Sequence, residues 1–239
     1  MDNKLAIIPA RGGSKRIPRK NIKLFLDQPI IKYSIDAAIN SNLFDEIMVS
    51  TDDDEIAKIA ISYGANVPFI RSEATSNDYA STVDVLEEVF SEYKKIGKAF
   101  EYCCCLYPAA PFISPQNLMK GFEILKESDA DSVVPVVRFS YPIQRALKIE
   151  KRRLFMVWPD NTGSRSQDLP SAYHDAGQFY WCRVENLLLH KKIFTENTVP
   201  IELSELEAQD IDNEEDWKIA EIKYKILMDS KWVGHIRRE

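Results

Sequence analysis

Short apolar runs alternate along this chain with longer segments of helical periodicity, and this alternation constrains the fold more than any other feature. Each run has five or six residues, the length of a buried strand. The predicted strands are Leu5–Pro9, Glu46–Ser50, Asn66–Ile70, Tyr102–Tyr107 and Ser132–Val137. The predicted helices between them are Pro29–Asn40, 52–63, Ser81–Lys95 and Pro115–Lys126. Strands separated by such helices form right-handed βαβ units, so we expect an α/β fold with a mostly parallel, twisted sheet flanked by helices.

The alternation breaks after Val137. Residues 139–175 are studded with Pro and Arg, and Arg145–Trp158 is typical of a hairpin rather than another βαβ unit. We expect 139–175 to leave the sheet as an arm that serves as a lid or a subunit contact. Beyond it the pattern predicts strands at Gln178–Cys182 and Val199–Leu203 and a closing helix at Glu214–Met228. We interpret the whole chain, 1–239, as a single domain.

Composition narrows the classes of function. The 239 residues include 31 Lys and Arg against 37 Asp and Glu, a net charge of 31 − 37 = −6, which disfavours non-specific binding of nucleic acid. No apolar run approaches the roughly 20 residues of a membrane helix, and Leu5–Ala10 is too short for a secretory signal. We therefore expect a cytoplasmic protein with no membrane partner. Consecutive cysteines at 103–105 alternate faces of a strand and Cys182 is distant, which predicts buried thiols rather than disulfides or a zinc site.

The loop after the first strand is strongly basic. Residues 11–23 read RGGSKRIPRKNIK and include six basic side chains, at Arg11, Lys15, Arg16, Arg19, Lys20 and Lys23. Gly12 and Gly13 let backbone N–H groups face an anion without a Cβ in the way, and Ser14 adds a hydroxyl. Ligands of open α/β sheets bind beyond the carboxyl ends of strands, which is where this loop lies. We predict a polyphosphate-binding loop, the alternative being a solvated basic loop; neither a Walker A motif nor G-x-G-x-x-G is present.

Two carboxylates before the closing helix, Asp210 and Asp212, form a candidate metal site. In extended backbone an i, i+2 pair lies on one face, with Ile211 turned toward the core. Mg²⁺ is held by one or two carboxylates, with phosphate oxygens and water completing its shell. Asp212 has an alternative role as a helix cap, because Glu215 follows three residues later. The 52–54 run of aspartates, by contrast, is interpreted mainly as a helix start.

Several segments together resemble the CMP-sialic acid synthetase family, the acylneuraminate cytidylyltransferases. The most specific match is Ile8–Ile22, and the later matches are Val49–Asp53, Phe69–Arg71, Asn77–Thr82 and Leu106–Phe112. The resemblance covers nearly the whole chain and implies a Rossmann-like nucleotidyltransferase fold. Within the family, Tyr107–Phe112 and Tyr173–Trp181 are most similar to members that activate pseudaminic acid. Tyr107 stands where the sialic acid enzymes typically have Gln.

The resemblance implies transfer of CMP from CTP to the anomeric hydroxyl of a nonulosonic acid, a nine-carbon acidic sugar, with release of pyrophosphate, for surface glycans or flagellin glycosylation. Pseudaminic acid is the favoured substrate, and legionaminic or N-acetylneuraminic acid is the alternative. Charge builds on the leaving group during transfer, so cations near the β- and γ-phosphates lower the barrier. The residues expected to meet this charge are Ser14, the Gly12–Gly13 amides, Arg11, Lys15 and Lys20, with Arg16 and Arg19 ranked lower. The expected catalytic residues are Arg11, Lys15, Lys20 and Asp210.

The resemblance also implies binding roles. The nucleotide is expected to meet the loop from Ala10 to Lys15 together with Lys20, and its cytosine is expected to be read by Asn21, Arg71, Ala80, Ser81 and Thr82. Arg71 has a plain alternative as a surface charge and Ser81 as a helix cap. The family places its metal pair at Asp210 and Asp212, so Mg²⁺ or Mn²⁺ is the expected cofactor. The sugar-binding candidates are Tyr107, Arg165, His174, Asp175, Gln178 and Phe179, with Arg165 a candidate partner for the sugar's carboxylate and no general base assigned.

Two other classes stay open. Some glycosyltransferases hold a nucleotide-sugar through a D-x-D pair such as Asp210–Asp212, although they need no basic triphosphate loop. A nucleotide-sensing or RNA-binding module is disfavoured by the acidic net charge and the lack of an aromatic-studded basic face. The expected partners are therefore CTP and an acidic nine-carbon sugar, with no nucleic acid. The arm and the resemblance both favour a homodimer in which the arm completes the neighbour's sugar site.

Overall fold

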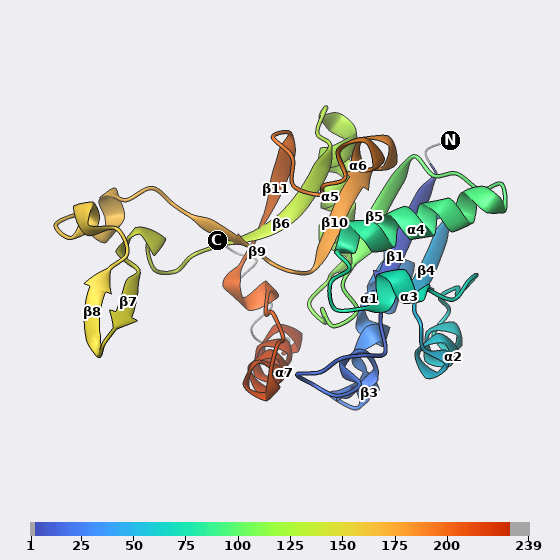
Figure 1. The fold of residues 1–239 in the computed structure, drawn as a ribbon, viewed down its shortest axis with the longest axis horizontal. Helices are drawn as coiled ribbons and strands as arrows, with labels where there is room; N and C mark the ends of the chain where they lie inside the picture. Colours follow the sequence, from blue (N-terminus) through green and yellow to red (C-terminus); the bar gives the residue numbers. More distant parts are fainter. Residues whose placement is uncertain (1–2, 230–239) are drawn as a thin grey trace.

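The computed structural model describes residues 3–229 and is built around a seven-stranded sheet (Figure 1). Its strand order is β11–β6–β10–β5–β1–β4, and β9 also pairs with β6. The strands are β1 Lys4–Pro9, β4 Glu46–Ser50, β5 Tyr102–Leu106, β6 Ser132–Arg138, β9 Tyr173–Asp175, β10 Phe179–Arg183 and β11 Thr198–Leu203. The β1–β4, β1–β5 and β6–β11 pairs are parallel, whereas β10 runs antiparallel to both β5 and β6, and β9 to β6. Five of the seven strands therefore share one direction, as predicted for this mostly parallel α/β fold.

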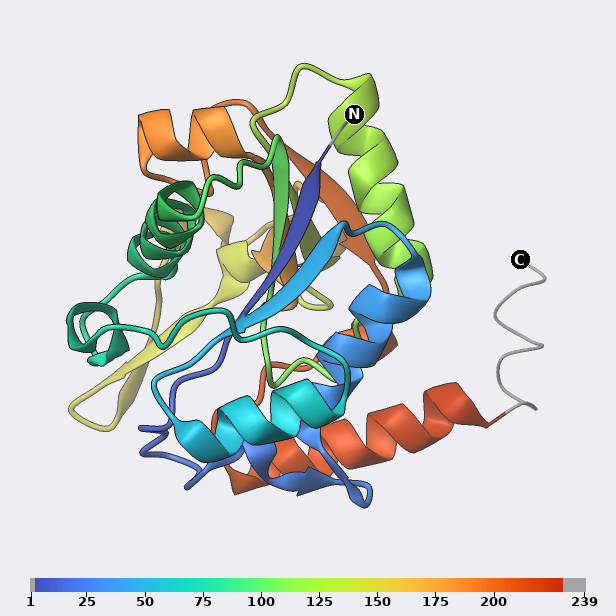
Figure 2. The same cartoon turned by 90° about the vertical axis from the view of Figure 1, so that its right-hand side faces the viewer.

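Helices cover both faces of the sheet. The α-helices are α1 Ile30–Ser41, α2 Asp54–Ser62, α3 Glu73–Ser76, α4 Thr82–Lys95, α5 Pro115–Glu127, α6 Val184–His190 and α7 Glu214–Met228. The shorter elements are η1 Lys20–Ile22, β2 Leu24–Phe25, β3 Gln28–Pro29, η2 Ile143–Arg145, β7 Leu147–Glu150, β8 Arg153–Met156, η3 Pro159–Asn161, η4 Ser166–Asp168 and η5 Glu205–Glu207. Figure 2 shows α1 and α5 on one side of the sheet and α4 and α6 on the other. Within residues 3–229, no helix combines the length and apolar character needed to cross a bilayer.

The core follows from side-chain alternation along the central strand. Ala6 and Ile8 of β1 pack in the cluster that includes α1 and α5, while Leu5 and Ile7 pack in the cluster that includes α4 and α6. Burying one such leucine or isoleucine contributes about 1.5–3 kcal/mol, so both faces of this strand hold the domain together. The cysteines obey the same rule: they are free and buried, and 104 faces the side opposite to 103 and 105, as predicted.

Side-chain caps fix where the helices begin. The carboxylate of Asp53 accepts the Glu55 and Ile56 N–H groups at the start of α2. Ser81 and Asp84 form a reciprocal capping box at the start of α4, which confirms the interpretation of Ser81 as a helix cap. Asn213 caps α7, and the helix-cap alternative for Asp212 is therefore wrong.

One predicted strand is wrong. Residues Asn66–Ile70 form only an isolated bridge between Asn66 and Met48, made by two hydrogen bonds on either side of Asn66. Pro68, two residues after Asn66, has no N–H to donate to the neighbouring strand. The pairing with β4 therefore stops at the single Asn66–Met48 bridge. Sequence periodicity also missed the small elements α3, α6 and β9, since each has at most seven residues.

The predicted arm leaves the sheet between β6 and β9 and projects away from the body of the molecule (Figure 1). It carries the β7–β8 hairpin within Arg145–Trp158, as predicted. Its last three residues, Tyr173–Asp175, belong instead to the sheet, because they pair with β6 from Val136 to Arg138. The arm thus spans residues 139–172, and its return strand brings Asp175 back to the carboxyl end of the central strands.

Candidate active site

The basic loop (residues 11–23) turns sharply at the carboxyl end of β1. Ala10 continues the ladder by donating its N–H to the Ser50 carbonyl at 2.8 Å. The Gly12 N–H then donates to the Asp52 carboxylate at 2.9 Å. A Cβ on Gly12 would lie 2.7 Å from an oxygen of Asp53, so a larger residue here would force the Asp53 side chain or the loops to shift. The Gly12 amide predicted to face phosphate is therefore bonded within the protein in this structure.

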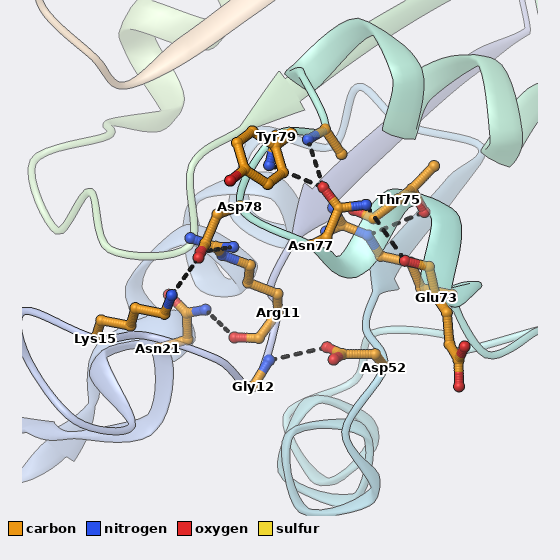
Figure 3. A network of polar contacts seen from close by, with 12 residues as sticks. Arg11, Gly12, Lys15, Asn21, Asp52, Glu73, Thr75, Asn77, Asp78 and Tyr79 are labelled. Carbon is orange, nitrogen blue, oxygen red and sulfur yellow. Dashed lines mark hydrogen bonds and ion pairs between the residues drawn. The ribbon is translucent and has the colours of Figure 1, made fainter.

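A carboxylate bridges two of the predicted phosphate-binding cations (Figure 3). Asp78 Oδ1 lies 2.7 Å from Arg11 Nη1, and its Oδ2 pairs with Lys15 Nζ. Hydrogen bonds from Lys15 and Arg11 hold the pKa of Asp78 below its usual range. Asn77 fixes the loop by accepting the N–H groups of Tyr79 and Ala80 at 2.8 and 3.0 Å. Asp78 lies in the segment Asn77–Thr82 that resembles the family, but no role for it was predicted from the sequence.

Lys20 lies against the two candidate metal carboxylates. Its Nζ donates to the Ile211 carbonyl at 2.8 Å, and burial lowers its pKa while Asp212 and Asp210 oppose that shift. Ile211 is 2% exposed, which confirms that it points into the core. Loss of surrounding water, together with the charge of Asp212, raises the pKa of Asp210, although its side chain still reaches solvent. Asp212 itself forms a 2.5 Å ion pair with Arg16.

One cavity of about 220 Å³ gathers much of this chemistry. Its lining comes from the basic loop, from the segment after β5, and from the segment before α7. The predicted residues that line it are Arg11, Ser14, Lys15, Lys20, Asn21, Tyr107 and Asp210, together with the lower-ranked candidate Arg16. Positive side chains and a carboxylate thus face one small space beyond the carboxyl ends of β1 and β5. This is the position at which an open α/β sheet binds its ligand.

The residues expected to read a base lie beside this cavity. Asn21 is 5% exposed and donates to the Arg11 carbonyl at 2.9 Å. Arg71 is 7% exposed and bonds to Thr75, so its interpretation as a plain surface charge is wrong. Burial lowers the pKa of Arg71, which the negative charges of Asp52 and Glu88 oppose. Arg71 and residues 80–82 do not line the cavity.

The sugar-binding candidates divide into two groups. Tyr107 lines the cavity and its hydroxyl lies 3.2 Å from the Thr82 hydroxyl. Gln178 is 2% exposed, donates through Nε2 to the Glu207 carbonyl, and leaves Oε1 buried without a hydrogen-bond partner among residues 3–229. His174 is exposed, with Nδ1 2.9 Å from the Asp175 carbonyl oxygen. The Asp175 carboxylate accepts the Gly177 N–H at 2.8 Å, and Gly177 lines the cavity.

Two predicted sugar contacts are placed elsewhere. Phe179 is completely buried in the core cluster that includes α1 and α5, so that prediction is wrong: alternation along β10 turns this ring inward, with no surface for a ligand. Arg165 lies on the projecting arm, where it pairs with Asp168 at 2.7 Å, outside the cavity lining. Within one chain, Arg165 is therefore not part of this site.

A basic loop at the carboxyl edge of a parallel sheet core, facing a carboxylate pair, defines a nucleotide-binding α/β protein. Residues 5–229 match the family model described as cytidylyltransferase, and the chain belongs to that family. It is 40% identical over 95% of its length to the pseudaminic acid cytidylyltransferase of Campylobacter jejuni, covering 98% of that protein. It is 33% identical over 91% of its length to the CMP-N,N'-diacetyllegionaminic acid synthase of Legionella pneumophila, covering 94% of it.

A solved structure supports the fold independently. The CTP complex of CMP:2-keto-3-deoxy-manno-octonic acid synthetase superposes with a TM-score of 0.69, covering 93% of this chain and 98% of that one. Identity to it is 17%, so this likeness bears on the fold alone. The α/β class expected from the alternation of strands and helices is confirmed.

Proposed function

We propose that this cytidylyltransferase joins CMP from CTP to the anomeric hydroxyl of a nonulosonic acid and releases pyrophosphate. The observation that carries the proposal is the single cavity that brings Arg11, Lys15 and Lys20 together with Asp210 and Tyr107. A triphosphate needs concentrated positive charge, and a hydroxylated ring needs polar and aromatic neighbours. Pseudaminic acid is the favoured sugar because of the 40% identity to an enzyme named for it. Legionaminic acid is the alternative, supported by the more distant relative.

The cations would act on the leaving group. In the reaction the sugar hydroxyl loses its proton to solvent and its oxygen bonds to the α-phosphorus, while the bond from that phosphorus to the bridging oxygen of pyrophosphate breaks. Negative charge grows on the departing oxygens, so Arg11, Lys15 and Lys20 lower the barrier by meeting that charge. Arg11 and Lys15 must first exchange Asp78 for phosphate oxygens. The reaction belongs in the cytoplasm, where CTP is made.

Asp210 and Asp212 fit a divalent cation. Their oxygens are the donors that Mg²⁺ or Mn²⁺ accepts. Burial raises the pKa of Asp210 and repulsion from Asp212 adds to the shift, and a cation would relieve that repulsion. No group of three or more metal-ligating side chains occurs within residues 3–229, so phosphate and water would supply the other ligands. When bound, the metal would neutralise phosphate charge and help orient the triphosphate.

Cytosine recognition is assigned to Asn21, which lines the cavity, and to Arg71 and residues 80–82, which lie outside its lining. The base requires donors for its O2 and N3 and an acceptor for its exocyclic amine. Asn21 and Arg71 are both nearly buried, where an unpaired polar group is costly and discrimination is correspondingly strong. The backbone of Ala80, Ser81 and Thr82 is proposed to provide the remaining contacts to cytosine, while the Ser81 side chain caps α4.

The arm supports assembly as a homodimer. Its hairpin exposes Leu147 at 56%, Ile149 at 75% and Leu154 at 65%, which is unusual for apolar side chains that lie together. A second copy of the chain would cover these side chains. Arg165 on the arm of one copy would then lie near the sugar site of the other copy. Ile149→Glu should yield a monomer in light scattering. Ile61→Glu on α2, where the side chain is 57% exposed, should leave the dimer unchanged; a monomeric wild-type protein would refute dimerisation.

The function is tested by pyrophosphate release from CTP in the presence of Mg²⁺ and a panel of pseudaminic, legionaminic and N-acetylneuraminic acids. We expect the fastest release with pseudaminic acid, CMP-sugar formed in equal amount, and little release when ATP or UTP replaces CTP. Absence of pyrophosphate with every sugar would refute the proposal. Transfer of sugar from a preformed nucleotide-sugar would instead support a glycosyltransferase.

A further inference from the structure

A buried tyrosine beside the cavity fixes one of the candidate sugar contacts. Tyr180 of β10 is 3% exposed, and its hydroxyl donates to Asp175 Oδ2 at 2.5 Å. Burial and the neighbouring groups raise the pKa of Tyr180, so the hydroxyl remains a donor. The other oxygen, Asp175 Oδ1, accepts the N–H of Gly177 at 2.8 Å. Both oxygens of this carboxylate are therefore held, although its side chain reaches solvent.

The same ring also supports Tyr107. The two tyrosine rings meet edge to face, with centroids 5.4 Å apart and an interplanar angle of 83°. The Tyr107 hydroxyl in turn lies 3.2 Å from Thr82 at the start of α4, and the Tyr107 N–H donates to the Gln178 carbonyl at 2.8 Å. A continuous chain of contacts thus runs from Thr82 through both tyrosines to Asp175, spanning the nucleotide and sugar sides of the site.

We infer that Tyr180 is a positioning residue for the sugar, which acts by orienting the Asp175 carboxylate and the Tyr107 ring. This inference rests on the proposed function. A carboxylate oxygen that accepts one hydrogen bond keeps a lone pair for a second, and a hydroxyl or N-acyl N–H of the sugar would be a suitable donor. Because both oxygens are already held, the Asp175 carboxylate loses little rotational freedom when the substrate binds, and the entropic cost of binding is smaller.

A second buried tyrosine provides a matched control. Tyr93 of α4 is 1% exposed, and its hydroxyl donates to Glu46 at 2.7 Å, so it is as buried as Tyr180 and likewise donates to a carboxylate, which here also pairs with Lys98. Glu46 is the first residue of β4, at the end of the strand opposite to the cavity. Removing the Tyr93 hydroxyl therefore reproduces the structural loss without touching the site.

The test compares Tyr180→Phe with Tyr93→Phe, using pyrophosphate release from CTP and pseudaminic acid with each substrate varied in turn. We expect both variants to lose similar thermal stability. Tyr180→Phe alone should raise KM for the sugar about tenfold, the factor that follows from losing one oriented hydrogen bond to a charged group. KM for CTP should stay within about twofold of wild type for both variants, because the hydrogen bond and ring contacts of Tyr180 are with Asp175, Tyr107 and Phe194, which are outside the basic loop.

A third variant separates positioning from other effects. If Tyr180 acts through Asp175, adding Tyr180→Phe to Asp175→Ala should raise KM for the sugar little beyond the value for Asp175→Ala alone. Kinetics of Tyr180→Phe equal to those of Tyr93→Phe, or an equal rise in KM for CTP, would overturn the inference while leaving the function intact. A wild-type protein that turns over no nonulosonic acid would overturn the proposed function, and the inference with it.

Discussion

The Asp78 carboxylate lies 2.7 Å from the Arg11 guanidinium and, through its second oxygen, also pairs with Lys15. An acidic side chain thus neutralises two cations of the cavity before any phosphate arrives. On the proposed function, an incoming triphosphate would compete with this carboxylate for Arg11 and Lys15. Each exposed ion pair that it displaces would weaken its net binding by a small factor.

Asp78→Asn should therefore bind CTP more tightly, by about threefold, because the competing charge is removed. Isothermal titration calorimetry with CTP measures this directly. Glu92→Gln is the control, since it removes a comparable ion pair, with Lys95 on α4, without touching the cavity. Weaker binding by Asp78→Asn would mean that the carboxylate holds Arg11 in place for the nucleotide instead of competing with it.

Lys20→Ala should lower kcat by about 100-fold, the usual cost of removing one donor to developing charge, with little change in sugar affinity. The half-buried Lys20 side chain lines the cavity, whereas nearby Lys23 pairs with Glu214 outside it. Lys23→Ala should therefore keep near wild-type kinetics, as measured by steady-state pyrophosphate release. An unchanged kcat in Lys20→Ala would remove this residue from the catalytic set.

Asp210→Asn and Asp212→Asn should each reduce turnover by at least about 100-fold, because the proposed site for a divalent ion would lose a charged ligand. Raising Mg²⁺ should restore activity only in part. Glu214→Gln changes a neighbouring carboxylate that pairs with Lys23, and it should remain active. Wild-type rates in both aspartate variants would contradict the metal assignment.

Gly12→Ala should lower the melting temperature by several degrees, since its Cβ would lie 2.7 Å from the Asp53 carboxylate and force two loops apart. Gly13→Ala is the matched change at the adjacent position, where no atom lies within 4 Å of the added Cβ. Differential scanning calorimetry of the two variants should show the loss only for Gly12→Ala. Equal melting temperatures would show that the Asp53 side chain can move aside freely.

Arg19 lowers the pKa of Asp53 to about 2 by hydrogen bonding, aided by the first-turn N–H groups of α2. A carboxyl whose folded-state pKa is depressed stabilises the fold above its unfolded pKa, near 4, and this contribution is lost as pH falls toward 2. Asp53→Asn keeps a capping side chain but loses the charge. Because Arg19 is partly exposed and solvent screens the pair, the free energy of unfolding should fall by only about 1 kcal/mol at pH 7.

The difference between wild type and Asp53→Asn should shrink as the pH falls below 4. Urea unfolding between pH 2.5 and 7 gives the required curves. A difference that is independent of pH would show that the Arg19–Asp53 ion pair does not stabilise the fold through charge.

Much of the fold could be predicted because its signals are local. The central strands are continuous apolar runs, and Asp53 and Ser81 cap helices within three residues of their own positions. The failures have equally physical causes. Pro68 ended the expected Asn66–Ile70 strand, and Phe179 followed the alternation of β10 into the core instead of facing a ligand.

Residues that matter through distant contacts could not be predicted. Asp78 is 67 positions from Arg11 in sequence, and nothing near it indicates that the two will meet. In the sequence, Tyr180 has the pattern of an ordinary core residue of a strand. Its hydrogen bond to Asp175 could not be predicted, because it depends on the turn at Gly177 that places Asp175 beside the Tyr180 hydroxyl. The basic loop was found because its charge, glycines and position after a strand coincide within thirteen residues.

The most direct test of the central claim is a crystal structure of the protein with CTP. We predict that the triphosphate lies in the cavity against Arg11, Lys15 and Lys20, and that Asp78 has released both cations. Nucleotide bound at another place, with the Asp78 ion pairs intact and the basic loop in contact with solvent alone, would contradict the account.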